Sequence, residues 1–306
     1  MKPRRSAAAG ALLSDIGENA LLEKLSRFLP VGKRVVAGSG DDAAIVRGPA
    51  SGDLLVLKTD CVVENVHFDN NAAPEAVGWK AMMRSLSDFA AVSGIPEFAL
   101  ITLMVNRARK VAWVSGIYRG LARAARLFDV SIVGGETSAA PRMAAISVCV
   151  VGRVEKNRWV SRRGGKAGDD LFVTGRLGGS IRGKHLRFVP RIEESRWLTE
   201  NFRIHAMMDL SDGLGADLPR LAKASGVGFQ IDNTALPRTP GASVKNAISD
   251  GEDYELLFAV SPDDSQKLQA EWRRKFPRLK LTRIGVFNRQ SAIRDPQLKD
   301  GYVHFQ

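Results

Sequence analysis

Short strand-like runs alternate with longer helical stretches along both halves of this 306-residue chain. In the first half, "LLVLKTD" (54–60) and "FALITLMV" (98–105) are typical of strands. The stretch between them (73–94) is typical of a helix, with Pro74 and Glu75 suited to its first turn. The second half repeats the alternation, with predicted strands at 169–175, 227–232 and 253–261 and a strand-turn-helix at 205–226. Such alternation predicts an α/β or α+β domain in each half.

Further segments of the first half add detail to this prediction. Residues 17–29 carry leucines at helical spacing, and Pro30 is expected to end that helix. Residues 112–128 predict another helix. "VSIVGGET" (130–137) predicts a strand with a glycine turn, and "AAISVCVVGRV" (144–154) predicts a long strand that could be buried on both faces.

The amino-acid composition changes near the middle of the chain. Residues 155–168, "EKNRWVSRRGGKAG", are polar, basic and rich in glycine, as linkers and entry loops are. We therefore expect one domain over 1–155 and a second over 156–306. After the strand at 253–261, we expect a helix and a short closing tail.

Composition excludes several classes of protein. The longest apolar runs fall far short of the roughly 20 residues that a membrane-spanning helix needs. The basic start has only a short apolar part, which Ser14 and Asp15 interrupt, so secretion is not expected. Cys61 and Cys149 lie in apolar β-like segments, where a buried free thiol is the usual state. We expect a protein of the reducing cytoplasm that does not associate with membranes.

The net charge of +12 would suit any polyanion, including a nucleotide or a nucleic acid. The basic residues are scattered or in short clusters, without zinc-finger spacing or an RNA-binding signature. Solvated surface is the simpler interpretation of each cluster, so a nucleic-acid partner is not expected.

Acidic residues recur where predicted strands and helices end. Asp41 and Asp42 follow the glycine turn "GSGDD", and Asp60 ends a predicted strand. The others are Asp88, Asp209 and Asp212. Each has an ordinary explanation, because aspartate caps helices and stabilises turns. Jointly they predict a site on loops of an α/β scaffold, where several carboxylates imply several Mg²⁺ ions and a polyphosphate.

An ordered set of motifs resembles the thiamine-monophosphate kinase family. It consists of "GDDAAIV", "KTDCVVENVHF", "GWKAMMRSLSDFAAVSGIPEFALITL", "VGGET", "RRGGKAGDDLFVTGRLGGS", "MMDLSDGLGADL", "DGEDYELLF" and "GYVHF". The wider superfamily includes aminoimidazole ribonucleotide synthetase and selenophosphate synthetase. Its members have an N-terminal α/β domain that dimerises through its sheet and a C-terminal α+β domain, with ATP held between them.

The resemblance implies transfer of the ATP γ-phosphoryl group to thiamine monophosphate, giving thiamine diphosphate, in a homodimer. No covalent nucleophile or general base is expected, because the acceptor phosphate is already anionic. The implied metal ligands are Asp42, Thr59 (through its hydroxyl or carbonyl), Asp60, Asp88, Glu136, Asp209 and Asp212. The implied ATP contacts are Gly135, Glu136, Arg162 and Ser211. The implied thiamine contacts are His67, Glu252 and Tyr302, although His67 would equally suit a structural histidine and Tyr302 a lid on the core.

Two residues depart from the family pattern. The usual "GGDT" is "GGET" here, so Glu136 offers its carboxylate from a longer stem, which would shift or remove the metal it holds. Lys58 stands where the family commonly has Ser or Thr in a metal-binding role. An ammonium there would repel a cation, or replace one by neutralising phosphate directly.

Two alternatives to the kinase stay open on the sequence alone. One is another ATP-using synthetase of the same superfamily, which would share the metal carboxylates without the thiamine pocket. The other is a catalytically silent protein that binds nucleotides or nucleic acid, which the charge and the two departures would suit.

Overall fold

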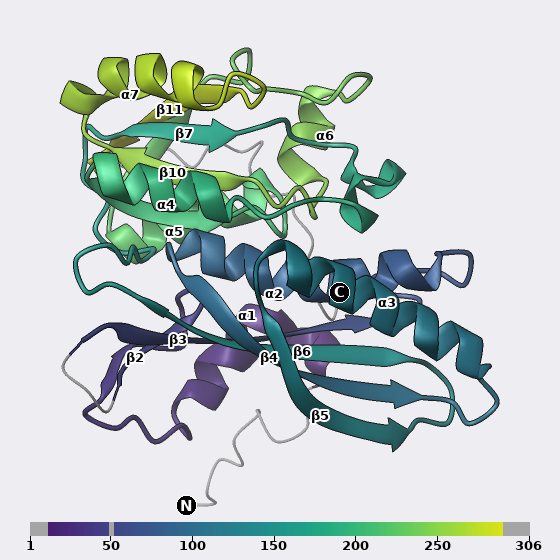
Figure 1. Cartoon of the computed structure of the whole chain (residues 1–306). Helices are drawn as coiled ribbons and strands as arrows, with labels where there is room; N and C mark the ends of the chain where they lie inside the picture. The colour runs from purple at the N-terminus through teal and green to yellow at the C-terminus, as the bar shows by residue number, and fades with distance from the viewer. Residues whose placement is uncertain (1–11, 49–51, 290–306) are drawn as a thin grey trace, which may run out of the picture.

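The computed structural model describes residues 12–48 and 52–289, which form two sheets with helices between and around them (Figure 1). The first sheet has six strands in the order β1-β2-β3-β6-β4-β5. All its pairs are antiparallel except β4 with β5. Its strands are β1 (Val35–Ala37), β2 (Ala44–Arg47), β3 (Leu54–Val63), β4 (Ile95–Val105), β5 (Ser131–Ala139) and β6 (Ala145–Val154).

The second sheet comes entirely from residues after the polar stretch at 155–168. Its five strands are antiparallel, in the order β8-β10-β7-β11-β9. They are β7 (Asp170–Thr174), β8 (Ile204–Asp209), β9 (Gly228–Ile231), β10 (Leu256–Val260) and β11 (Leu281–Asn288). The helices are α4 (Ile192–Asn201), α5 (Leu214–Ser225), α6 (Val244–Ser249) and α7 (Pro262–Lys275), with short 3-10 turns at Ser180–Arg182 and Lys184–Leu186. The sequence predictions did not include α4 or β11. The mixed α/β class is nevertheless confirmed in both halves.

Three helices belong to the first half: α1 (Leu13–Ser26), α2 (Pro74–Ala91) and α3 (Val111–Leu127). The α1 helix begins and ends earlier than the leucine spacing predicts, and Gly17 breaks it with a φ of 67°. The α2 and α3 helices approach so closely that a Cβ atom on Gly78 would lie 2.0 Å from the carbonyl oxygen of Ile117. Any larger residue at this crossing would force the two helices apart.

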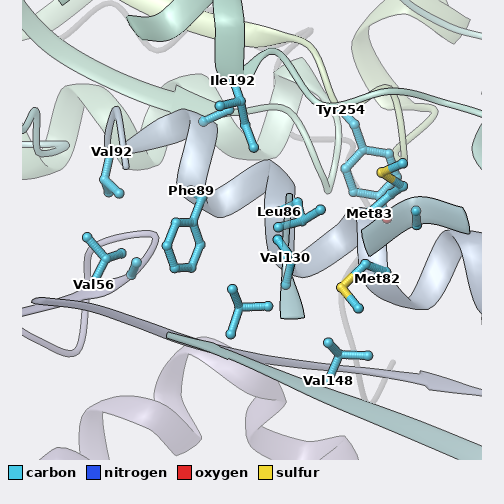
Figure 2. Packing of buried hydrophobic residues seen from close by; sticks show 14 of the residues in the cluster. Val56, Met82, Met83, Leu86, Phe89, Val92, Val130, Val148, Ile192 and Tyr254 are labelled. Carbon is cyan, nitrogen blue, oxygen red and sulfur yellow. The ribbon is translucent and has the colours of Figure 1, made fainter. Parts of the chain in front are cut away.

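Helix α2 lies between the first sheet and the C-terminal elements, and its apolar residues belong to one core cluster that includes residues of both (Figures 1 and 2). Phe89 and Met82 are fully buried and belong to the same cluster as Val148 of the first sheet and Ile192 of α4. A helix that is buried around most of its circumference needs apolar residues on nearly every side. Four polar residues of α2 are buried among them, namely Lys80, Ser85, Ser87 and Asp88.

The first sheet presents two faces of different character. Asp60, Val148 and Ile101 lie opposite one another on β3, β6 and β4, and they share the inner face that packs on α2. Their chain neighbours point to the outer face because side chains alternate along a strand. Phe98 and Leu100 of that outer face are 47% and 45% exposed. Strand β6 is therefore fully buried on one face and partly covered on the other, not buried on both as predicted.

The "VGGET" segment continues straight through both glycines as β5, whereas the sequence predicts a turn there. Gly135 has a φ of 154°, and a Cβ atom on it would lie 1.8 Å from the carbonyl oxygen of Ile101. Close pairing with β4 therefore requires glycine at this position.

The sequence analysis also predicts buried free thiols and no membrane-spanning helix. Cys61 and Cys149 are free thiols, as predicted, but both are only half-buried. Within residues 12–48 and 52–289, no helix combines the length and apolar character that crossing a membrane requires.

Candidate active site

Three aspartates from distant parts of the chain meet where the two halves join. Asp42 lies just before β2, Asp88 in the last turn of α2 and Asp209 at the end of β8. Each is at most 7% exposed. One carboxylate oxygen from each lies within 4.8 Å of the other two. We call these residues the aspartate cluster.

The protonation of the aspartate cluster reflects its crowding. Burial raises the pKa of Asp209 to about 7, and the charge of Asp42 adds to the rise, while a 2.5 Å hydrogen bond from Ser87 opposes it. Burial also raises the pKa of Asp88 well above its usual value, and Asp60 contributes further to this rise. A cation placed among these oxygens would relieve the repulsion between them.

Arg162 already neutralises one member of the aspartate cluster. Its Nε donates to Asp42 Oδ2 at 2.9 Å, and its Nη2 donates to Asp42 Oδ1 at 2.7 Å. Its backbone N–H donates to Asp41 Oδ1 at 2.8 Å, which fixes the segment that joins the two sheets. This forked contact is the strong form of an arginine–carboxylate pair. The residue expected to contact ATP is thus held beside the cluster.

Asp60 lies next to the aspartate cluster, between two cations. Lys58 Nζ and Arg84 Nη2 each lie 3.8 Å from its carboxylate. Burial would raise the pKa of Asp60, but Lys58 and Arg84 together hold it below its usual value. Lys58 also lies 2.9 Å from Asp88 Oδ1, so it links Asp60 to the cluster.

Two of the predicted metal ligands point away from the aspartate cluster. Thr59 is exposed on the outer face, with its hydroxyl 3.3 Å from that of Ser147. Glu136 is also exposed and lies opposite Thr102 on the same face. It is separated from β3 by three strand spacings, or about 14 Å. Of these two residues, only Thr59 keeps a candidate ligand within one chain, which is its backbone carbonyl.

Ser211 and Asp212 of "MMDLSDGLGADL" lie in the turn between β8 and α5. Asp212 pairs with Arg220, which also bonds Asp217 Oδ1 at 2.9 Å. The backbone N–H of Asp212 donates to Asp217 Oδ2 at 3.0 Å. The backbone carbonyl of Ser211 accepts from the N–H of Glu252 at 2.7 Å. Asp212 is therefore neutralised separately from the three clustered aspartates.

Two predicted substrate residues are joined by a lysine that the sequence analysis missed. Lys80 Nζ lies 2.6 Å from Glu252 Oε1 and donates to the His67 carbonyl at 2.6 Å. Burial lowers the pKa of Lys80 to about 8, although Glu252 opposes this. The only available signal was a lysine inside the apolar helix segment "GWKAMM". Tyr302, the third predicted substrate residue, lies outside the described residues.

The "GEDYE" segment adopts an unusual backbone beside this lysine. Glu252 and Tyr254 have φ angles of 64° and 51°, a region that residues other than glycine rarely adopt. The Tyr254 hydroxyl donates to Glu252 Oε1 at 3.4 Å, and its ring stacks on Phe188 at 3.9 Å. Strain of this kind is commonly retained at functional sites.

Comparisons with known proteins place this geometry in a family. The model of the AIR synthase related protein N-terminal domain matches residues 40–154, and that of the C-terminal domain matches residues 159–291. The thiamine-monophosphate kinase of Rhodopirellula baltica is 34% identical over 309 residues, covering 93% of this chain and 95% of that protein. The enzyme of Aquifex aeolicus is 34% identical over 276 residues, covering 80% of this chain and 86% of that protein.

Solved structures agree with the sequence comparisons. The structure of AaThiL complexed with AMPPCP and TMP superposes with a TM-score of 0.82 at 31% identity, covering 97% of this chain and 100% of that one. The chain therefore belongs to the AIR synthase related proteins and, within them, to the thiamine-monophosphate kinase family.

Proposed function

We propose that this protein phosphorylates thiamine monophosphate to thiamine diphosphate at the expense of ATP. One observation supports this most strongly: a chain that is 34% identical to a thiamine-monophosphate kinase along nearly its whole length buries three aspartates in one cluster. The structural relative complexed with AMPPCP and TMP supports the same pair of substrates.

The donor set fits Mg²⁺. Asp42, Asp88 and Asp209 offer hard carboxylate oxygens within 4.8 Å of one another. Burial raises the pKa values of Asp88 and Asp209, and neighbouring carboxylates add to the rise. We propose that these three residues hold magnesium, with the Thr59 carbonyl as a further candidate. Bound Mg²⁺ would supply neutralisation of the phosphate charges and stabilisation of a loose transition state.

The residues of the chain itself would orient the reactants. Arg162 carries a fixed positive charge at the aspartate cluster, where it would attract the polyphosphate of ATP. The Lys80–Glu252 pair and the His67 carbonyl, which Lys80 contacts, would form one wall of the thiamine side. No general base is required, because the acceptor oxygen of thiamine monophosphate is ionised at neutral pH.

An assay of ADP release tests the proposal. Purified protein with ATP, Mg²⁺ and thiamine monophosphate should release ADP, and omission of either Mg²⁺ or thiamine monophosphate should abolish the release. ADP release that requires a different acceptor would favour another synthetase of the superfamily. Absence of turnover across a range of metals and salt concentrations would contradict the kinase function.

We also propose a homodimer formed through the outer face of the first sheet. Phe98, Leu100 and Val133 leave an apolar surface there, and exposed apolar patches of this kind mark protein interfaces. Leu22 and Leu25 of α1 are exposed as well. Light scattering should give twice the chain mass, and Leu100→Glu should reduce it to one chain. A monomeric wild-type protein at micromolar concentration would contradict the dimer.

We place this activity in the cytoplasm. Both thiols are free, and a reducing compartment keeps them so. Fractionation of the source cells should recover the protein with soluble cytoplasmic enzymes, and recovery from an oxidising compartment would contradict this assignment.

A further inference from the structure

Lys58 projects from β3 into the oxygens that surround the aspartate cluster. Its Nζ lies 2.9 Å from Asp88 Oδ1 and 3.8 Å from Asp60 Oδ2. It also donates to the Asp42 carbonyl at 3.1 Å. These three oxygens come from residues expected to hold metal ions. The ammonium thus makes contacts of the kind that a bound cation would make.

A lysine side chain can stand in for a bound cation. It has a single positive charge and three hydrogen-bond donors, and it cannot leave the protein. The chain itself thus supplies a cation between Asp60 and Asp88.

The cations of the site nearly equal its carboxylates in number. Four carboxylates meet here, those of Asp42, Asp60, Asp88 and Asp209. Three cations lie against them, those of Lys58, Arg84 and Arg162. Since each cation balances one carboxylate, the protein itself compensates most of the negative charge. Where carboxylates crowd together without such cations, protonation or bound divalent ions provide this compensation.

We propose that Lys58 is a resident cation that occupies a latent divalent-metal site between Asp60 and Asp88, so that the protein binds one metal ion fewer than its carboxylates would otherwise hold. The ion bound by Asp42, Asp88 and Asp209 is retained, with Asp88 shared between it and Lys58. This inference rests on the proposed function, because it concerns how the same site balances the charge of its phosphates. Lys58 acts as a positioning residue, since it holds Asp60 and Asp88 in place.

Counting bound metal tests the proposal directly. Equilibrium dialysis of the full chain against Mn²⁺, with and without AMPPCP, gives the number of ions per chain. Lys58→Thr should bind one ion more than the wild type, because it removes the ammonium and leaves room between Asp60 and Asp88. Lys58→Arg, which keeps the charge, should bind the wild-type number. Lys33→Thr makes the same change at an exposed position and should also leave the number unchanged.

An unchanged ion count in Lys58→Thr would overturn the proposal, as would a gain in Lys58→Arg. If Lys58→Thr is unfolded in EDTA, the proposal requires Mn²⁺ to restore its unfolding temperature to near that of the wild type, and failure to do so would overturn it equally. ADP release by the wild type is measured on the same preparation. Lack of turnover there would remove the proposed function, whereas the ion count would still decide the role of Lys58.

Discussion

The two faces of the N-terminal sheet differ in what covers them and in what they carry. The inner face packs on α2 and presents Lys58 and Asp60 to a buried polar site. The outer face presents Thr59 and Glu136 to solvent, beside exposed apolar residues such as Leu100. Because side chains alternate along a strand, neighbours in one motif serve different faces. A continuous sequence motif in a strand therefore does not define a single site.

Replacing Asp88 should reduce turnover more than any other change, and it distinguishes a metal-binding role of the aspartates from a purely structural one. Asp88→Asn keeps the size of the side chain but removes the charge that would hold metal. We expect turnover to fall about 10²- to 10³-fold, the loss typical when one transition-state-stabilising group is removed. The unfolding temperature should change little, because asparagine has nearly the same size, and loss of the ion pair with Lys58 is offset by less repulsion from Asp60 and Asp209. Near-normal, Mg²⁺-dependent turnover in a folded variant would remove Asp88 from the site.

Substitutions on the two faces should differ in their effect on the free energy of unfolding, because the inner face is packed and the outer face is exposed. Ile101 is 1% exposed, whereas its neighbour Leu100 is 45% exposed. Ile101→Ala should lower the free energy of unfolding by about 2–5 kcal/mol, because it leaves a cavity under α2. Leu100→Ala should cost less than about 1 kcal/mol within the chain, with any further loss dependent on protein concentration. Denaturant unfolding at several concentrations measures both, and equal costs would contradict the assignment of the faces.

A pH series tests the raised pKa of Asp209. Folded Asp209 keeps its proton up to about pH 7, whereas in the unfolded chain it loses the proton near its usual value of 3.8. Between these values the folded state binds more protons, so the stability of the metal-free protein should fall as the pH rises toward and through 7. Added Mg²⁺ or Asp209→Asn should flatten this part of the profile. A metal-free profile that rises across the same range would contradict the crowding of the carboxylates.

The smallest effect is expected on the outer face. Thr59→Val removes a hydroxyl that points away from the aspartate cluster while keeping the shape of the side chain and the backbone carbonyl. We expect turnover to stay within about threefold of the wild type, because an exposed change away from the site has little effect. A loss as large as that of Asp88→Asn would show that the hydroxyl reaches the reaction, for example across a dimer interface.

Helices and strands with a clear apolar pattern in their own sequence could be predicted. The structure contains β3 and β4, which include the strands predicted at 54–60 and 98–105. It also contains α2, which lies within the helix predicted at 73–94. Apolar patterning and Pro74 favour these elements. Strand β11 was missed because polar residues interrupt it, and one of them, Arg283, pairs with Asp170 of β7 across the sheet. Only tertiary pairing explains that strand.

The candidate site was predictable in part. The acidic positions at element ends identified Asp42, Asp88 and Asp209, and the structure brings these three together. The split between faces was not predicted, because it depends on the register of β3 with its neighbour β6. The roles of Lys80 and Arg84 were also missed, since a buried cation becomes recognisable only once its carboxylate partner is placed.

The fate of the γ-phosphoryl group of ATP distinguishes direct transfer at the aspartate cluster from hydrolysis of ATP. The protein is incubated with Mg²⁺, thiamine monophosphate and ATP labelled at its γ-phosphate, and the products are separated by chromatography. The label should appear in the terminal phosphate of thiamine diphosphate, with one ADP formed for each, and Asp88→Asn should reduce both about 10²- to 10³-fold. Label recovered only as inorganic phosphate, or thiamine diphosphate formed equally well by Asp88→Asn, would contradict direct transfer at the aspartate cluster.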